Sequence, residues 1–243
     1  MQERGVRIFS ITDHDTLNAY RYIEPPPRTQ IVTGIEINTT WDEGEVHVLG
    51  YRVPLDDPAL TSVLERNRAA REVRVGQMVE LLRSAGHDIS IEAVRAESQE
   101  GAALGRPHVG KALIRAGITA DIESAFRDFL RRGKPGYVPS THITPFEAID
   151  AIRAAGGVAV LAHPGRLKDY TTIESLAEHG LDGLEVFYPR HEPAQIQYFR
   201  DVATRLGLVM TAGADFHDIR YNKRGVGIEV DEADIKPFLR SIG

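Results

Sequence analysis

The sequence contains no cysteine, and none of its 243 residues belongs to a long apolar run. Without cysteine the chain forms no disulfide, thiolate zinc site or cysteine nucleophile, which is typical of proteins in a reducing compartment. No stretch approaches the roughly 18 consecutive apolar residues of a membrane-spanning helix. The first residues also lack the basic-then-apolar pattern of a secretory signal. We therefore expect a cytoplasmic protein that does not act on a membrane.

An excess of positive charge is absent as well. The 29 Lys and Arg residues are outnumbered by 35 Asp and Glu residues, which gives a formal net charge of -6. Because a protein with this balance has no overall basic field to attract a polyanion, we do not expect binding to double-stranded DNA. A phosphorylated ligand has to be held by local cations or by bound metal ions instead.

Two parts of the chain, residues 1–59 and 140–243, alternate apolar strand patterns with amphipathic helical patterns. Such alternation predicts an α/β domain whose parallel strands are joined by right-handed crossover helices. In barrels built this way, the catalytic groups lie at the carboxyl ends of the strands. The predicted strands are residues 6–12, 31–35, 45–51, 157–162, 183–187, 208–212 and 226–230.

Residues 60–139, between these two parts, have a different character. They are rich in arginine, and their apolar residues recur at helical spacing, as in Val75, Met78, Val79 and Leu82. No convincing strand pattern interrupts them. We predict that this stretch is a helical insertion, a subdomain beside the domain formed by residues 1–59 and 140–243.

Side chains that bind metal ions stand at the ends of four predicted strands and within a fifth. A single histidine after a strand is more often a hydrogen-bonded structural residue. Agreement among five strands is different, because the strand ends of one barrel meet at a shared mouth. Imidazole nitrogens and carboxylate oxygens suit zinc, manganese or iron, and a glutamate can bridge two ions. The residues are His14, Glu36, His47, His163, Asp215 and His217.

Five motifs resemble, in order, those of the PHP phosphoesterases, the polymerase and histidinol phosphatase family. They are Ser-Ile-Thr-Asp-His-Asp-Thr at 10–16, Gly-Ile-Glu-Ile at 34–37, Val-His-Val-Leu-Gly at 46–50, Leu-Ala-His-Pro at 161–164 and Gly-Ala-Asp-Phe-His at 213–217. The closest likeness is to the branch that dephosphorylates nucleoside 3′,5′-bisphosphates and trims the 5′ ends of short RNAs. The likeness covers nearly the whole chain, including the helical insertion.

The resemblance implies a distorted (β/α)7 TIM-like barrel that holds two or three divalent ions of Mn, Zn or Fe. It implies that Glu36 bridges two ions and that His47 and His163 complete the site of one of them. Asp215 would bind another ion. The third ion would be bound by His14 and His217.

The activity that the resemblance implies is hydrolysis of phosphate esters by metal-activated water. Bound metal ions acidify water and neutralise phosphate oxygens, so that no protein nucleophile is needed. Glu36, Asp215 and His217 are the expected catalytic residues. The expected substrates are small phosphorylated nucleotides, such as 3′,5′-bisphosphates, or the 5′ ends of short RNA.

The chain departs from the family at its start. The family's first strand normally reads Asp-Leu-His-x-His-Ser and supplies two histidines to one ion, whereas no histidine precedes Ser10 in this chain. We therefore expect a barrel without its first strand, in which the site of Glu36, His47 and His163 alone is complete. One interpretation is that the sequence begins downstream of that strand. The alternative is a truncated, non-catalytic PHP remnant that binds nucleotide or a partner protein.

Substrate-binding residues are expected in the insertion. Gly105-Arg106-Pro107-His108 precedes a predicted helix and resembles the family's phosphate-holding Arg-Pro-His. Arginine binds phosphate in a bidentate manner and a nearby histidine adds a donor, although a surface arginine beside a helix start has the same pattern. If Arg106 and His108 bind substrate, the insertion is a lid over the metal ions. Arg190 follows a strand end and is a further candidate, with a polar loop as the alternative.

A metal-dependent amide or lactone hydrolase is a third hypothesis, because similar barrels catalyse those reactions. Arg106 and His108 favour an anionic group in the substrate, and so they favour the phosphoesterase.

Overall fold

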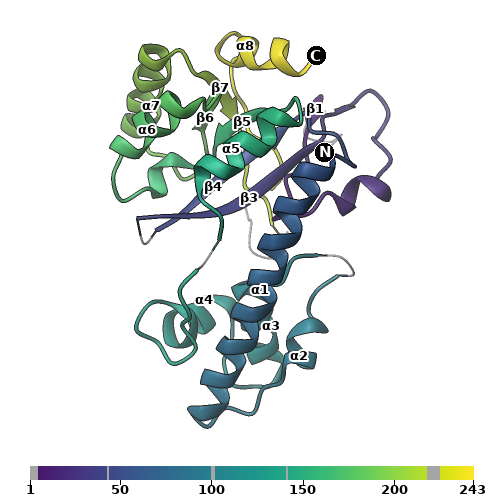
Figure 1. The fold of residues 1–243 in the computed structure, drawn as a ribbon, viewed down its shortest axis with the longest axis vertical. Helices are drawn as coiled ribbons and strands as arrows, with labels where there is room; N and C mark the ends of the chain where they lie inside the picture. The colour runs from purple at the N-terminus through teal and green to yellow at the C-terminus, as the bar shows by residue number, and fades with distance from the viewer. Residues whose placement is uncertain (1–4, 43, 100–101, 141, 218–224) are drawn as a thin grey trace.

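The computed structural model of this protein describes residues 5–42, 44–99, 102–140, 142–217 and 225–243. Helices and strands are mixed along the chain, and the predicted α/β class is confirmed (Figure 1). In Figure 1 the central sheet and the helices that cover it lie in the upper part. The helices of the insertion project below them.

Five strands form the central sheet, in the order β3-β4-β5-β6-β7. β3 (Gly34–Trp41) pairs antiparallel with β4 (Gly44–Tyr51), which pairs antiparallel with β5 (Val158–Leu161). β5, β6 (Gly183–Phe187) and β7 (Val209–Ala212) are parallel. The prediction of parallel strands was therefore wrong for β3 and β4. A connection as short as that between β3 and β4 makes a hairpin, which joins antiparallel strands.

Helices cover one face of this sheet. Apolar side chains of these helices form the largest buried cluster together with alternate residues of the strands, such as Ile35 and Val48. Thr144 caps the helix that precedes β5, because its Oγ1 accepts a hydrogen bond from the backbone N–H of Glu147. The helices are α1 (Pro58–Ser84), α5 (Pro145–Ala154), α6 (Thr171–His179) and α7 (Pro193–Leu206).

The opposite face of the sheet has an apolar part and a polar part. Phe238 and Ile242 of the C-terminal helix α8 (Glu232–Ile242) pack on the apolar part, against Tyr51 and its neighbours. The polar part carries the predicted metal ligands of β3 and β4. The predicted metal ligands of β3 and β4 thus lie on the face that the crossover helices leave uncovered.

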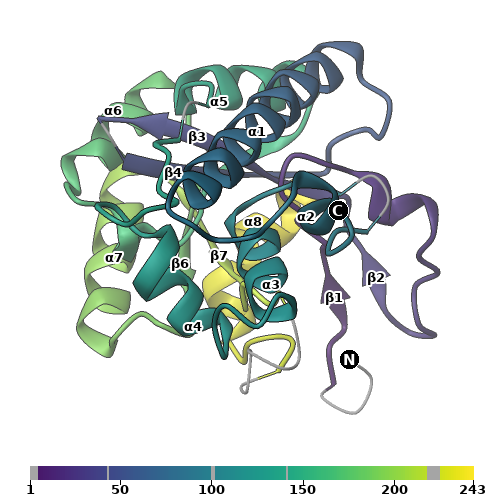
Figure 2. The ribbon, with the colours of Figure 1, turned by 90° about the horizontal axis from the view of Figure 1, so that it is seen from below.

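A two-stranded sheet lies at the edge of the molecule, where β1 (Ile8–Phe9) pairs in parallel with β2 (Gln30–Ile31) (Figure 2). Further along the same segment, His14 forms an isolated parallel bridge with Glu36 of β3. Between these two pairings, the hydroxyl of Tyr20 lies 2.7–3.0 Å from four backbone groups, which are N and O of Ile11, O of Val32 and N of Gly34. These contacts join both segments. The segment that contains His14 therefore runs beside β2 and β3.

The described strands do not close into a barrel, because they form one sheet of five strands and one of two. The strand predicted at residues 226–230 was wrong: residues 225–231 form no strand. Gly225 and Gly227 both adopt positive φ there, which an extended strand does not allow.

Residues 60–139 are helical, and the part that the structure describes contains no strand. Leu82 and Leu113 are fully buried members of a second apolar cluster that belongs to these helices. None of the described helices is long and apolar enough to cross a membrane, including the 27-residue α1. After α1 come α2 (Ile91–Arg95), α3 (Arg106–Arg115), α4 (Ile122–Ala125) and a π-helical turn, η3 (Phe126–Leu130).

Candidate metal centre

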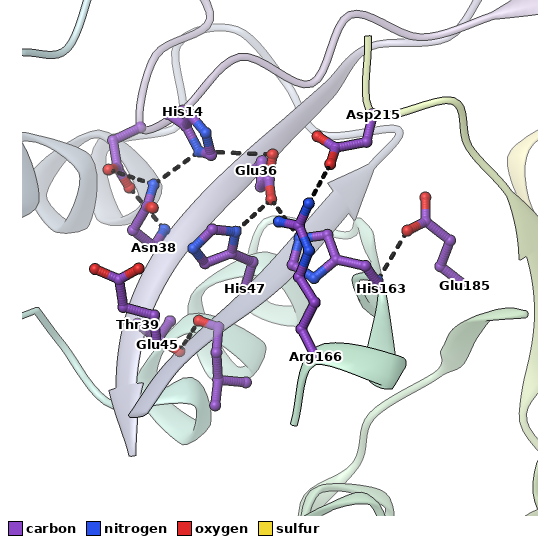
Figure 3. A network of polar contacts seen from close by, with 12 residues as sticks. His14, Glu36, Asn38, Thr39, Glu45, His47, His163, Arg166, Glu185 and Asp215 are labelled. Atoms are coloured by element: carbon purple, nitrogen blue, oxygen red, sulfur yellow. Dashed lines mark hydrogen bonds and ion pairs between the residues drawn. The ribbon is translucent and has the colours of Figure 1, made fainter. Parts of the chain in front are cut away.

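Glu36 lies at the centre of a group of imidazoles on the polar face of the sheet (Figure 3). Its neighbours in β3, Ile35 and Ile37, belong to the apolar core, so Glu36 points to the opposite face. The same alternation in β4 directs His47 to this face. Nδ1 of His47 lies 2.6 Å from Oε1 of Glu36, whose side chain is buried.

Two more histidines reach Glu36 from other segments. His163 follows β5, and its Nε2 lies 3.2 Å from Oε1 of Glu36. His14 comes from the segment beside β3, and its Nδ1 lies 3.5 Å from Oε2 of Glu36. His14, Glu36 and His47 each offer a ligand atom, and these atoms lie within 4.8 Å of one another. The structure thus brings four of the six predicted ligands together.

Asp215 and His217 follow β7 and lie at the edge of this group. Nδ1 of His217 lies 3.2 Å from Oδ1 of Asp215, and the His217 ring centroid lies 5.7 Å from that of His14. Oδ2 of Asp215 accepts a hydrogen bond of 2.9 Å from the hydroxyl of Tyr188. It accepts another, of 3.1 Å, from Nη2 of Arg166 (Figure 3). Sequence reasoning did not find Arg166, since an arginine in a loop gives no signal of its own.

Three residues of the site have a left-handed backbone that residues with side chains rarely adopt. The φ angles are 53° at Asp15, 30° at His163 and 46° at Asp215. Such a conformation costs about 1–3 kcal/mol and persists where the surrounding structure enforces it, which is frequent at functional sites. At His163 it turns the chain sharply at the end of β5, before Pro164.

Glu185 is a buried carboxyl of this face that the sequence analysis missed. Its Oε2 accepts a hydrogen bond of 2.8 Å from the backbone N–H of His163 (Figure 3). Burial raises the pKa of Glu185 to about 7, although the nearby His163 opposes that shift. A Cβ on Gly213 would lie 2.0 Å from Oε1 of Glu185, so a larger residue there would displace this carboxylate. A signal existed: a glutamate interrupts the otherwise apolar strand Gly183–Phe187.

Asp15 is the centre of a second missed feature, a buried polar network beside His14. Its carboxylate accepts hydrogen bonds from Nε of Arg71 at 2.7 Å, Nδ2 of Asn67 at 3.0 Å, and both the backbone N–H and Nδ2 of Asn38. Nδ2 of Asn38 also lies 3.0 Å from Nδ1 of His14. Because Asn67 and Arg71 lie on α1, the network joins this helix to a candidate metal ligand.

The pKa shifts of His14 and Glu36 favour the charge states that metal ligands need. The pKa of His14 falls to about 4 because of burial first, with Glu36 opposing the shift and Arg71 adding to it. Burial alone would raise the pKa of Glu36, yet the imidazoles of His14, His47 and His163 together hold it well below its ordinary value. A neutral imidazole and an ionised carboxylate are the forms that bind cations.

The three predicted substrate-binding residues, Arg106, His108 and Arg190, have different surroundings in the structure. Nη2 of Arg106, the first residue of α3, donates a 2.6 Å hydrogen bond to Glu45. Glu45 precedes His47 by two residues on β4, so both point to the polar face. His108 accepts a hydrogen bond from the backbone N–H of Gly105 through its Nδ1, as part of the start of α3. Arg190 is exposed in the loop after β6.

A cavity of about 920 Å³ opens on this face. Polar and apolar groups line it together, with Tyr51 and Phe238 on its apolar side. Its volume is in the range of pockets that hold small-molecule ligands. Its polar lining includes His14, Glu36, His163, Glu185, Asp215 and His217.

The donor set fits divalent cations of the zinc, manganese and iron type. Imidazole nitrogens and carboxylate oxygens are their ligands, and Glu36 offers two oxygens to imidazole-bearing neighbours on both sides. The pocket is concave, partly apolar and directly beside these donors. A mixed α/β fold with such a site belongs to the class of metal-dependent hydrolases.

Comparison with curated proteins gives relatives that act on phosphate esters, while no family model matches the chain. The chain is 31% identical over 229 residues to the 5′-3′ exoribonuclease Rnm of Escherichia coli, covering 88% of this chain and 76% of that protein. It is 30% identical over 247 residues to a 3′,5′-nucleoside bisphosphate phosphatase of Chromobacterium violaceum, with 98% and 86% covered. It is 34% identical over 228 residues to a phosphoribosyl 1,2-cyclic phosphate 1,2-diphosphodiesterase of Eggerthella lenta, with 88% and 84% covered.

Solved structures agree with these sequence relatives. A protein of Bifidobacterium adolescentis described as a metal-dependent phosphoesterase superposes with a TM-score of 0.86 at 29% identity, covering 99% of this chain and 87% of that one. An amidohydrolase of Chromobacterium violaceum with bound sulfate and no metal superposes with a TM-score of 0.78 at 30% identity. This match covers 89% of this chain and 79% of that one. The chain belongs to the PHP family of metal-dependent phosphoesterases, in the branch of nucleoside bisphosphate phosphatases and 5′-3′ exoribonucleases.

Proposed function

We propose that this phosphoesterase hydrolyses phosphate esters of nucleotides, either 3′,5′-bisphosphate nucleotides or the 5′ ends of short RNA. The observation that carries the proposal is the convergence of His14, His47 and His163 on the buried carboxylate of Glu36. The activities of the Escherichia coli and Chromobacterium violaceum relatives support this substrate class.

The proposed metal ligands are the six residues that the sequence singled out. Glu36, His47 and His163 would hold one ion, His14 and His217 would serve a second, and Asp215 a third. Manganese, zinc and iron all suit these donors. When bound, such ions acidify water and neutralise phosphate oxygens, and that is the chemistry hydrolysis of a phosphate ester requires.

The chain's own residues would then orient the ester. Arg106 is held against the metal-bearing strand by Glu45, and a substrate phosphate can replace that carboxylate as its partner. His108, two residues further along α3, would add a donor through Nε2. The similar amidohydrolase of Chromobacterium violaceum contains sulfate without metal, which is consistent with binding of an anion in the absence of a metal ion. We propose that residues 60–139 act as a lid and that exposed Arg190 contributes at the pocket rim.

We also propose that the fold is a distorted (β/α)7 TIM-like barrel and that the protein is cytoplasmic. The sheet, with Glu36 and His47 on the face that the crossover helices leave free, is consistent with part of a distorted (β/α)7 barrel. A cytoplasmic location fits a nucleotide or short RNA as substrate and a chain without cysteine.

Phosphate release from a 3′,5′-bisphosphate nucleotide, measured with and without added manganese, tests the proposal. The full chain should release phosphate only with the metal, and Glu36→Gln should lower the rate by more than about 100-fold because the central ligand charge is lost. Glu174→Gln, which changes a partly exposed carboxyl paired with Arg205, is the matched control and should leave the rate unchanged. No release by the unaltered chain that nevertheless binds the nucleotide would favour the non-catalytic remnant.

A further inference from the structure

We propose that Arg166 binds the phosphoryl group of the substrate, a role that rests on the proposed function. Nη2 of Arg166 lies 3.1 Å from Oδ2 of Asp215 and 2.6 Å from the hydroxyl of Tyr188. Figure 3 shows the side chain reaching across the site toward Asp215. A guanidinium in this place meets any anion that enters between Asp215 and Glu36.

The loop that carries Arg166 is firmly anchored. Nε2 of His191 accepts a hydrogen bond from the backbone N–H of Gly165, while Nδ1 of His191 lies 2.9 Å from the carbonyl oxygen of Val186. The carbonyl requires a proton on Nδ1, so Nε2 is the acceptor and both contacts are satisfied by one tautomer. A Cβ on Gly165 would lie 2.8 Å from the His191 ring, so the loop packs closely on it. Arg166 is therefore presented from a rigid turn.

The guanidinium itself is supported on one side and open on the other. It lies over the ring of buried Tyr188, with the Arg166 carbon Cζ 5.5 Å from the ring centroid. Tyr188 donates its proton to Asp215 and accepts from Arg166, so the hydroxyl links the two charged groups. Both hydrogen bonds of Arg166 with described residues use Nη2, and 44% of the side chain is exposed. Nε and Nη1 therefore remain as donors for a ligand.

A phosphoryl group is the ligand that fits this arrangement. The planar fork of a guanidinium matches two oxygens of a phosphate, and a fixed cation favours the charge that such oxygens carry. A purely structural ion pair would need no exposed donors and no anchored loop beneath it. The sequence suggests the exposed Arg190 for this task, but among the described residues it is Arg166 that forms an ion pair with the candidate metal ligand Asp215.

Binding of inorganic phosphate to the full chain, measured by calorimetry with and without manganese, tests the role of Arg166. Arg166→Met should weaken phosphate binding by about 10–100-fold and raise the KM for the bisphosphate nucleotide by a similar factor, whereas Arg166→Lys should recover part of both. Manganese affinity should change by less than about 3-fold. Arg205→Met, which removes a surface arginine paired with Glu174, should leave all three quantities unchanged.

Two results would overturn the role of Arg166. Phosphate binding by Arg166→Met equal to that of the unaltered chain shows that Arg166 does not touch the anion. A parallel fall in manganese affinity shows that it only positions Asp215. If Arg166→Met does not fold, Arg166→Gln replaces it, because glutamine keeps a donor for Asp215 without the charge. The same two measurements, phosphate binding and manganese affinity, then decide. Failure of the proposed function gives a different result, namely no turnover of the nucleotide by the unaltered chain. In that case, comparing phosphate binding by the unaltered chain and by Arg166→Met still tests the role of Arg166.

Discussion

Glu45 shows how one carboxylate can link the insertion to the sheet. It accepts hydrogen bonds from Arg106 of α3, from Arg74 of α1 and from the hydroxyl of Ser140. Burial by itself would raise the pKa of Glu45, but Arg106, then Ser140 and Arg74, outweigh burial and lower it to about 2. Glu45 is therefore ionised in the folded protein under all ordinary conditions, and it holds Arg106 close to His47.

The lowered pKa of Glu45 predicts an acid-dependent loss of stability. Since its pKa is about 2 in the folded protein and near 4.5 otherwise, its stabilising effect is fully present above pH 4.5 and disappears as the pH falls toward 2. Glu45→Gln should lower the free energy of unfolding by up to about 3 kcal/mol at pH 6 and by progressively less below pH 4.5. Urea unfolding between pH 3 and 7 measures this difference. Glu80→Gln, an exposed change on α1, is the control; a Glu45→Gln effect independent of pH would contradict the prediction.

At the scale of elements, α1 belongs to two apolar cores. Leu60 and Leu64 near its start pack in the cluster of the sheet, whereas Met78 and Leu82 near its end pack in the cluster of the insertion. Between them, Asn67 and Arg71 make the polar network with Asp15. Arg71 also donates to the carbonyl oxygen of Leu104, directly before the start of α3. A single helix therefore connects the candidate metal ligands with the segment that carries Arg106.

Leu113→Ala should weaken the apolar core of the insertion without affecting the core of the sheet. Leu113 of α3 is fully buried in the insertion, so its truncation should cost about 2–5 kcal/mol of stability. The KM for the nucleotide should rise, because α3 carries Arg106, while manganese affinity should stay unchanged, because His14, Glu36 and His47 lie on and beside the sheet. Thermal unfolding, calorimetry and steady-state kinetics measure the three quantities. Leu81→Ala, at a residue 43% exposed, is the control; an equal loss of metal affinity in Leu113→Ala would show that the two cores do not act separately.

At the scale of the whole molecule, the sheet separates the main apolar core on one face from the cluster around Glu36 on the other. Crossover helices and the start of α1 bury one face, and α8 covers the apolar part of the other. Glu36 and its three histidines lie on the rest of that second face, where their mutual contacts hold several segments together. A cation bound to groups from β3, β4 and the loop after β5 should therefore stabilise the tertiary structure as a unit.

Divalent metal should raise the unfolding temperature of the protein. Free manganese at about 100 times its Kd adds about 2.7 kcal/mol to the stability of a protein that binds it only when folded. For a chain of this size that corresponds to roughly 5–10 °C, and excess EDTA should reverse the shift. Differential scanning fluorimetry measures it. Glu36→Gln should show a much smaller shift, and an identical shift in both proteins would place the metal elsewhere.

The sequence by itself determined what depends on neighbouring residues. Alternation along β3 and β4 directs Glu36 and His47 away from the apolar core, and the local hydrogen bond of Thr144 caps α5. The ordered motifs also identified the PHP family. These features follow from local periodicity and local hydrogen bonds, which a few consecutive residues decide.

Tertiary structure alone decided the partners of the charged groups. His163 meets Glu36 across 127 positions of sequence, Arg71 reaches Asp15 across 56, and Arg166 reaches Asp215 across 49. No local pattern marks such pairs, because burial and the packing of separate segments select which donor faces which carboxylate. Tertiary packing likewise selected the backbone N–H of His163 as the partner of Glu185, although the glutamate itself interrupts an apolar strand. The prediction of parallel strands was wrong for β3 and β4 because a short hairpin joins them.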